Sequence, residues 1–314
     1  TGWADDPASY RVVSVDGGDP SYAEPAPPRD VSRKSKPTDE ARVDVWRFVY
    51  PQRHQLYLDL PTPLVEGVTY ELRFVGHDPA IAPVRYRHAP AEQVSEAIHV
   101  SQIGFEPGDA VKHAYLSLWR GDGGAMAYAA GLPFSVIDES GEVAFRGVTE
   151  LSLGRDGTEM ARGRNYSEVD VYRLDFSGLD EPGVYRVMLH GVGSSRPFPI
   201  RAGVWGEAFR VSVRGLLHHR SGLALGPPHT EFRRPATMKP GEDGFMVYAS
   251  GAPLMPPPGD PRQGQGGTFE RLREAMTDEP VPEAWGGYMD AGDWDRRAAH
   301  LSCSRLLVEL YELH

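Results

Sequence analysis

The sequence predicts a multidomain protein of the β plus α class. We expect an N-terminal β domain, then a β-sandwich of immunoglobulin type, then a helical region. Apolar side chains alternate with period two over residues 46–74 and again over 98–200, which is typical of strands with one buried face. Near residue 204 the apolar spacing changes to that of a helix. We place the domain boundaries at residues 1–95, 96–202 and 203–314.

The first domain is expected to begin with an irregular segment. Residues 1–40 are polar and rich in proline, and they carry one predicted strand at 10–15. Alternation then predicts further strands, which together indicate one antiparallel sheet with a buried face. These strands cover residues 46–50, 56–60 and 68–74. A linker rich in proline and alanine is expected over residues 77–92.

The second domain shows short strands and turns without a helical pattern. The turn Asp-Glu-Ser-Gly at residues 138–141 is expected to close a hairpin, and Asp-Glu-Pro-Gly at 180–183 is a second predicted turn. About 100 residues of this kind favour an immunoglobulin-type sandwich. Cys303 is the one cysteine of the sequence, so an intrachain disulfide is excluded. We expect Cys303 to be a small core side chain on a helix.

The third region is predicted to be helical at both ends. Helices are expected at residues 204–217 and 298–311, with a short helical piece at 269–276. Residues 226–283 give few periodic signals, and loops of this length inside compact domains are often functional. Two helices and a loop cannot close a core alone, so we expect this domain to be cut short.

An acidic loop separates this long stretch from the last helix. Asp290, Asp293 and Asp295 lie within six residues, and neighbouring glycines allow tight turns that point the first two into one space. The following helix N-terminus favours ionised carboxylates. Such aspartates suit an activated water beside a sugar ring, and three aromatics flank them: Trp285, Tyr288 and Trp294. Two plainer interpretations stay open, an acidic turn with a helix cap and a cation-binding loop.

Charge and hydropathy exclude several partners. The sequence has 33 basic and 44 acidic residues, a net charge of −11, so neither nucleic acid nor an anionic membrane surface is expected as a partner. No run of about 18 apolar residues is present, so no membrane span is expected. The oligomeric state stays open.

Residues 286–294 read Gly-Gly-Tyr-Met-Asp-Ala-Gly-Asp-Trp. This motif resembles the Gly-Gly-aromatic-x-Asp-Ala-Gly-Asp-aromatic signature of glycoside hydrolase family 9, the inverting cellulases and related β-glucanases. Residues 98–107 resemble the opening strand of that family's N-terminal immunoglobulin-like domain, and 183–187 resemble a late strand of it. His-His-Arg-Ser-Gly at 218–222 resembles the end of the first catalytic helix. Residues 1–95 are not covered by the resemblance.

The resemblance implies that residues 203–314 are the first part of an (α/α)6 toroid. Asp293 is then the general base, and Asp290 helps it to hold the nucleophilic water across the sugar from a general acid. Trp285, Tyr288 and Trp294 become candidates for stacking on sugar faces. The implied substrate is a β-1,4-glucan or a related β-glycan. Because such polymers lie outside the cell, a secreted or periplasmic protein is expected.

Two departures from the family matter. The family's general acid is a glutamate far beyond the aspartate loop, and by position neither Glu309 nor Glu312 can replace it, so we expect this chain alone to be inactive. Many relatives carry a Cys-His pair of a zinc site where this sequence has Arg-Pro-Ala-Thr-Met at residues 234–238. Zinc is therefore not expected. No cofactor is required, while structural calcium bound through Asp and Glu oxygens stays open.

Alternatives from other classes are a non-catalytic carbohydrate-binding or adhesion protein and an exo-acting β-glycosidase. Smaller features receive plain interpretations. We expect the arginine pairs at 233–234 and 296–297 to be ion-pair partners of nearby carboxylates. His218 and His219 point to different faces of a helix and are not expected to form a metal pair. The glycosylation sequon at residues 165–167 is taken as incidental.

Overall fold

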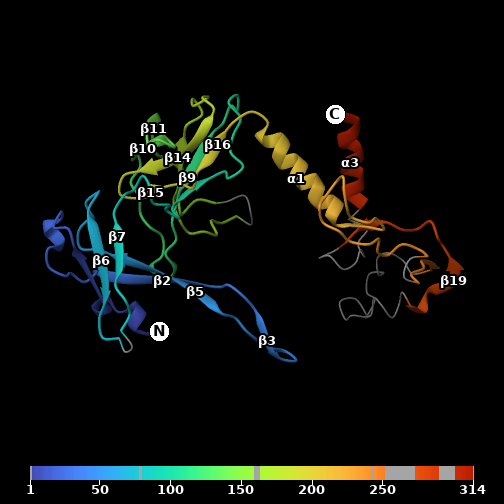
Figure 1. Cartoon of the computed structure of the whole chain (residues 1–314), viewed down its shortest axis with the longest axis horizontal. Helices are drawn as coiled ribbons and strands as arrows, with labels where there is room; N and C mark the ends of the chain where they lie inside the picture. The colour runs from blue at the N-terminus through green and yellow to red at the C-terminus, as the bar shows by residue number, and fades with distance from the viewer. Residues whose placement is uncertain are drawn as a thin grey trace. The chain divides into compact units, whose positions relative to one another are not determined.

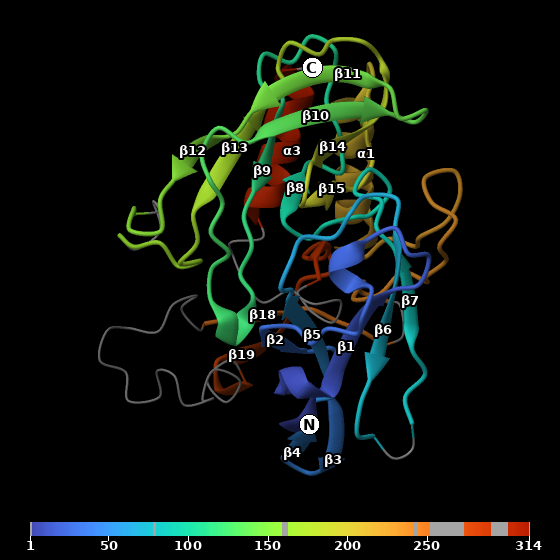
Figure 2. The ribbon, with the colours of Figure 1, turned by 90° about the vertical axis from the view of Figure 1, so that its left-hand side faces the viewer.

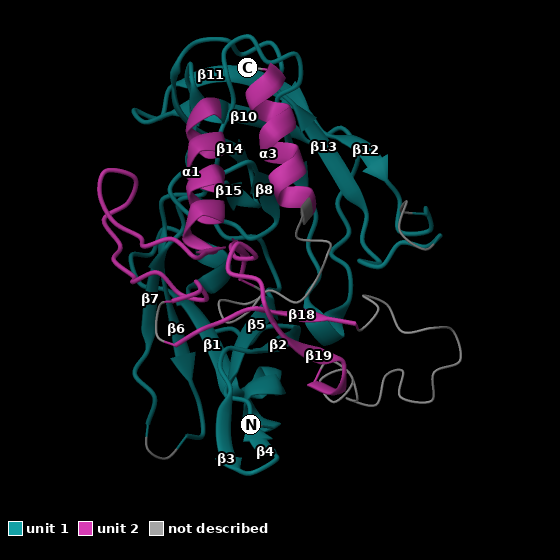
Figure 3. Cartoon of the chain, turned by 90° about the vertical axis from the view of Figure 1, so that its right-hand side faces the viewer, with its two compact units in different colours: residues 1–205 teal, residues 206–314 magenta. Residues whose placement is uncertain are grey.

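The computed structural model describes residues 2–77, 80–158, 163–241, 244–251, 273–289 and 301–313 (Figure 1). The chain divides into two compact units, Thr1–Trp205 and Gly206–His314 (Figure 3). Strands dominate the first unit, whereas helices and short strands form the second. The predicted order of β structure followed by helices is therefore confirmed. The predicted three-domain division remains a prediction.

A three-stranded antiparallel sheet forms the N-terminal part of unit 1. Its order is β1 (Tyr10–Ser14), β6 (Thr69–Phe74) and β7 (Val84–Arg87). The short 3-10 helices η1 (Gly2–Asp5), η2 (Pro7–Ser9) and η3 (Pro20–Tyr22) flank it. The small core contains Val12, Tyr22, Val68 and Tyr70. Strand β7 lies inside the predicted linker over 77–92, and that prediction was wrong because its backbone hydrogen-bonds to β6.

Residues 30–59 form a long two-stranded ribbon. Strand β2 (Asp30–Pro37) pairs with β5 (Gln52–Asp59), and β3 (Ala41–Asp44) pairs with β4 (Arg47–Val49) at the far end. Two predictions were wrong here. Residues 30–37 are not irregular, because β5 supplies their backbone partners. The predicted strands 46–50, 56–60 and 68–74 do not share one sheet, and the first of them faces solvent, since Trp46 is 87% exposed.

Two packed sheets form the predicted immunoglobulin-type sandwich (Figure 2). One has the order β11-β10-β14-β15, with β16 also paired to β14. The other has the order β12-β13-β9-β8. The strands of the first sheet are β10 (Pro133–Asp138), β11 (Val143–Val148), β14 (Gly183–Leu189), β15 (Gly193–Ser194) and β16 (Phe198–Ile200). Those of the second are β8 (Ile98–Val100), β9 (His113–Leu116), β12 (Glu150–Leu153) and β13 (Val171–Asp175).

The sandwich core comes from the inward-facing positions of both sheets. Alternate residues of each strand point inward, so one side chain in two is buried along β14. Three phenylalanine rings meet at centroid distances of 5.4–5.8 Å: Phe105, Phe176 and Phe198. The predicted hairpin over residues 138–141 is confirmed, because Asp138 accepts hydrogen bonds from the backbone N–H groups of Ser140 and Glu142.

Lys112 is a fully buried lysine at the edge of this core. Its ammonium nitrogen lies 3.0 Å from the carbonyl oxygen of Pro107, 2.9 Å from that of Asp109 and 3.2 Å from that of Ser177. The Asp180 carboxylate completes the shell at 2.8 Å. Lysine is almost never fully buried without such partners. Its charge therefore joins the loop before β9 to the turn before β14.

Helix α1 (Val204–His218) belongs to unit 2 from Gly206 onward, and helix α3 (Leu301–Leu313) lies wholly in unit 2. The predicted helices are confirmed over these ranges. Cys303 does lie on α3, but it is partly exposed and so is not the core side chain that was expected. Strands β18 (Tyr248–Ser250) and β19 (Met276–Pro280) pair within the stretch predicted to lack periodic structure. Residues 269–272 of the helical piece predicted at 269–276 lie outside the described residues, and Met276 at its end belongs to β19. No described helix is both long and apolar enough to cross a membrane.

Candidate functional site

The end of α1 and the segment before Asp290 come together in unit 2. Strand β17 (Arg220–Ser221) follows α1 directly and pairs antiparallel with β20 (Gly287–Tyr288). The pairing brings Arg220 opposite Tyr288 and Ser221 opposite Gly287. Two motifs that the sequence placed about 70 residues apart, at 218–222 and 286–289, thus form one small sheet.

Met289 extends this pairing by one residue. Its backbone N–H donates to the carbonyl of His219 at 2.7 Å, and its carbonyl lies 3.3 Å from Nδ1 of the His219 ring. Both polar groups of the Met289 backbone are therefore engaged by one residue. These hydrogen bonds therefore fix the backbone at Met289, the residue immediately before Asp290, which is the first member of the predicted catalytic pair.

Arg234 braces the same junction from a third segment. Its guanidinium donates to the carbonyl of His218 at 3.0 Å and to that of Arg220 at 2.6 Å. The Met289 sulfur lies 3.4 Å from the same group. The expectation that Arg234 pairs with a carboxylate was wrong, because these carbonyls take its donors. Sequence reasoning missed this role, since no local pattern links Arg234 to carbonyls 14 and 16 residues before it.

Trp285 lies against Gly222, and this contact requires glycine. Gly222 has φ of +77°, and a Cβ built there would lie 2.4 Å from Cε3 of the Trp285 ring. The indole is 40% exposed, with the ammonium of Lys239 5.0 Å from its ring centroid. Trp285 therefore keeps an accessible part, as a ring that stacks on a sugar requires.

Tyr288 is buried, with 9% of its surface exposed. The Arg220 guanidinium carbon lies 5.2 Å from the centroid of its ring. Arg220 also donates to the carbonyl of Gly287 at 3.2 Å. Tyr288 therefore packs against Arg220 within the β17–β20 pair. Sugar stacking by this ring remains a prediction.

The other predicted site residues, Asp290, Asp293 and Trp294, lie outside the described residues, so their roles remain predictions. Glu309 on the last helix forms an ion pair with Arg305. His218 and His219 have different partners: Nε2 of His218 lies 2.8 Å from the Thr230 hydroxyl, and Nδ1 of His219 lies 3.3 Å from the Met289 carbonyl. The prediction that both lie on a helix was wrong for His219, because α1 ends at His218. Among the described residues, no group of three or more His, Cys, Asp or Glu side chains is placed to hold a metal ion.

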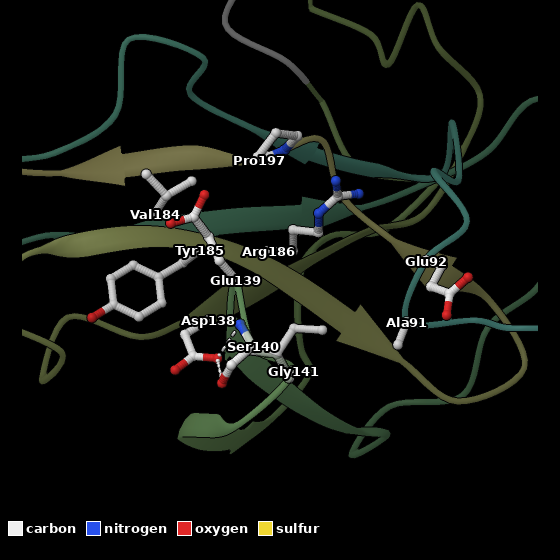
Figure 4. Close-up of a pocket in the computed structure, with 11 residues that line it drawn as sticks. Ala91, Glu92, Asp138, Glu139, Ser140, Gly141, Val184, Tyr185, Arg186 and Pro197 are labelled. Carbon is white, nitrogen blue, oxygen red and sulfur yellow. Dashed lines mark hydrogen bonds between the residues drawn. The ribbon is translucent and has the colours of Figure 1, made fainter.

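The sandwich carries a surface hollow of about 530 Å³ beside the 138–141 turn and β14 (Figure 4). Its carboxylate Asp138 accepts a 2.7 Å hydrogen bond from the Ser140 hydroxyl, and this contact holds the pKa of Asp138 below its usual range. Tyr185 at its wall is buried, and its hydroxyl donates to the Glu181 carbonyl at 3.0 Å. Asp138 therefore stabilises the 138–141 turn, and Tyr185 stabilises the turn at 180–183.

Asn165 of the sequon is buried as well. Its side-chain amide donates to the carbonyls of Gly154 and Val169 at 3.3 and 3.2 Å. Its oxygen accepts the backbone N–H groups of Ser167 and Glu168 at 3.0 Å. The amide is therefore a structural bridge of the loop.

A known protein family matches the middle part of the chain. The family described as "Cellulase N-terminal ig-like domain" matches residues 93–194. This segment is similar to the immunoglobulin-like domain of cellulases. Two curated sequences of "Endoglucanase D" from Acetivibrio thermocellus are 25% identical to the chain over 170 residues. The match covers 51% of this chain and 22% or 21% of those proteins, so the chain spans about a fifth of the length of these relatives.

Solved structures similar to the chain include two family 9 proteins. One is a metagenome-derived glycoside hydrolase family 9 endoglucanase, with 23% identity, a TM-score of 0.39, and coverage of 62% of this chain and 29% of that one. The other is described as "Bacteroides ovatus GH9", with 19% identity, a TM-score of 0.39, and coverage of 62% and 28%. The resemblance to cellulases with an immunoglobulin-like domain is confirmed by the domain match and the Endoglucanase D relatives.

Proposed function

We propose that this chain carries the base half of the active site of an inverting glycoside hydrolase. The proposed substrate is a β-1,4-glucan or a related β-glycan. The observation that carries the proposal is the pairing of Met289 with His219, because it joins the Arg-Ser-Gly helix end to the aspartate motif. The relationship to Endoglucanase D supports the substrate class.

In this mechanism Asp293 is the general base and removes a proton from the attacking water. Asp290 accepts a second hydrogen bond from that water and fixes its position. Attack from this side inverts the anomeric centre while an acid on the opposite side protonates the leaving oxygen. Because the chain spans about a fifth of its curated relatives, we propose that the acid comes from another part of the complete enzyme. The chain alone is then inactive.

The hydrogen bonds around Met289 position the start of the aspartate loop in this mechanism. Arg234 and Arg220 hold the backbone from two segments, so the aspartates that follow start from a fixed point. A fixed starting geometry lowers the entropy cost of arranging water and base. Trp285 would bind a sugar face beside them. The accompanying proposals are an (α/α)6 toroid that includes residues 203–314, and secretion to where polymeric glycans lie.

The test is hydrolysis by the full-length gene product on soluble β-glucans and on chitosan-type oligosaccharides. Asp293→Asn should lower turnover by at least ~10², because it removes the general base. Asp295→Asn, a carboxylate of the same loop without an assigned role, serves as the matched control and should retain activity. Undiminished hydrolysis by the Asp293 variant would contradict the proposal. Glycan binding without any turnover would favour the non-catalytic alternative.

A further inference from the structure

The far end of the ribbon exposes aromatic side chains to solvent. We call Trp46, Phe48 and Tyr50 the aromatic tip. Trp46 is 87% exposed and Tyr50 50% exposed, while Phe48 is partly exposed. The ribbon end extends past the other strands of unit 1 (Figure 1). Large apolar side chains that are exposed together on a surface often mark an interaction or ligand-binding site.

The turn that presents the tip is not built from favourable turn residues. Val45 and Trp46 occupy it, where glycine, asparagine or aspartate is usual. Polar neighbours hold its backbone instead: the Asp44 carboxylate accepts the Val45 N–H at 2.7 Å, and Arg42 donates to the Asp44 carbonyl at 3.1 Å. A violated local rule is expected where function uses the residue.

The base of the ribbon is hydrogen-bonded to the segment that resembles a cellulase immunoglobulin-like domain. The Glu96 carboxylate accepts from the Lys34 ammonium at 3.0 Å, from the Gln55 amide at 2.9 Å and also from the Tyr57 hydroxyl. The Asp122 carboxylate accepts the Arg33 N–H at 2.6 Å. These hydrogen bonds fix the base of the ribbon, so the aromatic tip at its other end is held away from this contact.

The length and charge of the hairpin that carries the aromatic tip indicate which kind of ligand it binds. The distal hairpin over residues 38–51 has 14 residues, fewer than the roughly 20–30 per side of a stable protein interface. It carries two arginines and three carboxylates, so it is close to neutral in a chain of net charge −11. A small, nearly neutral aromatic surface complements an uncharged chain whose rings present flat apolar faces.

We propose that the aromatic tip binds an uncharged β-glucan chain, as an accessory subsite made by residues of unit 1 alone. The identity of the glycan rests on the proposed function, whereas the binding surface does not. Phe48 is the middle residue of β4 (Arg47–Val49), and Tyr50 directly follows that strand. Trp46 in the adjoining turn extends the surface beyond them.

The test is native affinity electrophoresis of the 314-residue chain in gels containing hydroxyethyl cellulose, an uncharged soluble β-glucan derivative. The wild-type chain should be retarded, and Trp46→Ala should weaken binding at least about fivefold. Trp46→Tyr should restore most of it. Tyr311→Ala is the matched control, because Tyr311 is also 87% exposed, and it should leave retardation unchanged.

Each other outcome decides against the subsite. No retardation of the wild-type chain, or equal retardation of wild type and Trp46→Ala, overturns it. If Trp46→Ala instead abolishes self-association on gel filtration, the tip is a contact between copies and the subsite is overturned. Hydrolysis by the full-length enzyme is scored separately: turnover without tip binding refutes the subsite alone, and tip binding without turnover refutes the catalytic proposal alone.

Discussion

The backbone N–H of Met289 donates a 2.7 Å hydrogen bond to the carbonyl of His219. This contact joins the last residue before the predicted catalytic pair to the residue that follows α1. Arg234 reaches the carbonyls on either side of His219, those of His218 and Arg220. The geometry of the candidate site therefore depends on three segments that lie far apart in sequence, and each can be tested separately.

Replacing Arg234 should loosen this junction. Arg234→Met leaves two partly buried carbonyls without their donors, and each such loss costs about 1–3 kcal/mol. We expect unit 2 to lose about 2 kcal/mol of unfolding free energy, measured by urea denaturation. Arg234→Lys should recover only part of this, because an ammonium does not reproduce the guanidinium fork.

The neighbouring residue provides the control for that variant. Arg233 is exposed, so Arg233→Met should change the free energy of unfolding little. In the full-length enzyme, Arg234→Met should lower kcat more than it raises KM, since the change affects positioning rather than glycan contact. Equal stability of the two arginine variants would show that Arg234 does not brace the junction.

Gly222→Ala should disrupt the contact with Trp285. A side chain at φ of +77° is strained, and the added Cβ would lie 2.4 Å from the indole. Strain of this kind costs about 1–3 kcal/mol. Gly226→Ala is the matched control, because nothing lies within 4 Å of a Cβ there. The readouts are the urea midpoint and the emission maximum of tryptophan fluorescence, and unchanged values for Gly222→Ala would contradict the packing.

Lys112→Met should destabilise unit 1 strongly. The variant fits the volume but removes the donor that three carbonyls share, at about 1–3 kcal/mol for each one left unsatisfied. We expect a total loss of about 3 kcal/mol, measured by chemical denaturation. Asp180→Asn removes the carboxylate charge but keeps the three carbonyls around Lys112. The Asp180 side chain is 69% exposed, so losing its negative charge should cost less than about 1 kcal/mol of unfolding free energy. Similar losses for both variants would contradict this division.

Acid should weaken the contact between Asp170 and Arg155. The Arg155 side chain, at 2.7 Å, and the Arg155 N–H hold the pKa of Asp170 below its usual range. A lowered folded-state pKa means that the carboxylate stabilises the fold fully above the unfolded pKa of about 3.9. This stabilisation is lost as the pH falls through the lower folded value.

The measurement is the unfolding free energy of wild type minus that of Asp170→Asn between about pH 7 and pH 2. The difference should be constant above about pH 5 and should shrink below about pH 4. Arg155→Met serves as the partner control, because in its background Asp170→Asn should show a weaker pH dependence. A difference that stays constant over the whole range would contradict the assignment.

The local features of the chain were predictable from sequence. The 138–141 hairpin, helix α1 and the alternating strands of the sandwich follow from turn chemistry and apolar period, which act over a few residues. The aspartate motif and the Arg-Ser-Gly motif were also visible as sequence patterns. Their approach through β17 and β20 was not predicted, since a two-residue pairing leaves no periodic signal.

Pairing between distant segments was decided by tertiary structure. Alternation at Trp46, Phe48 and Tyr50 predicts a strand with one buried face, yet within the described part of the chain Trp46 is 87% and Tyr50 50% exposed. Strand β2 and strand β7 form because partners elsewhere satisfy their backbone groups. Arg234 acquires its role in the same way. Sequence determines which segments are able to be strands or helices, whereas burial and the choice of partner depend on contacts that only the folded chain brings together.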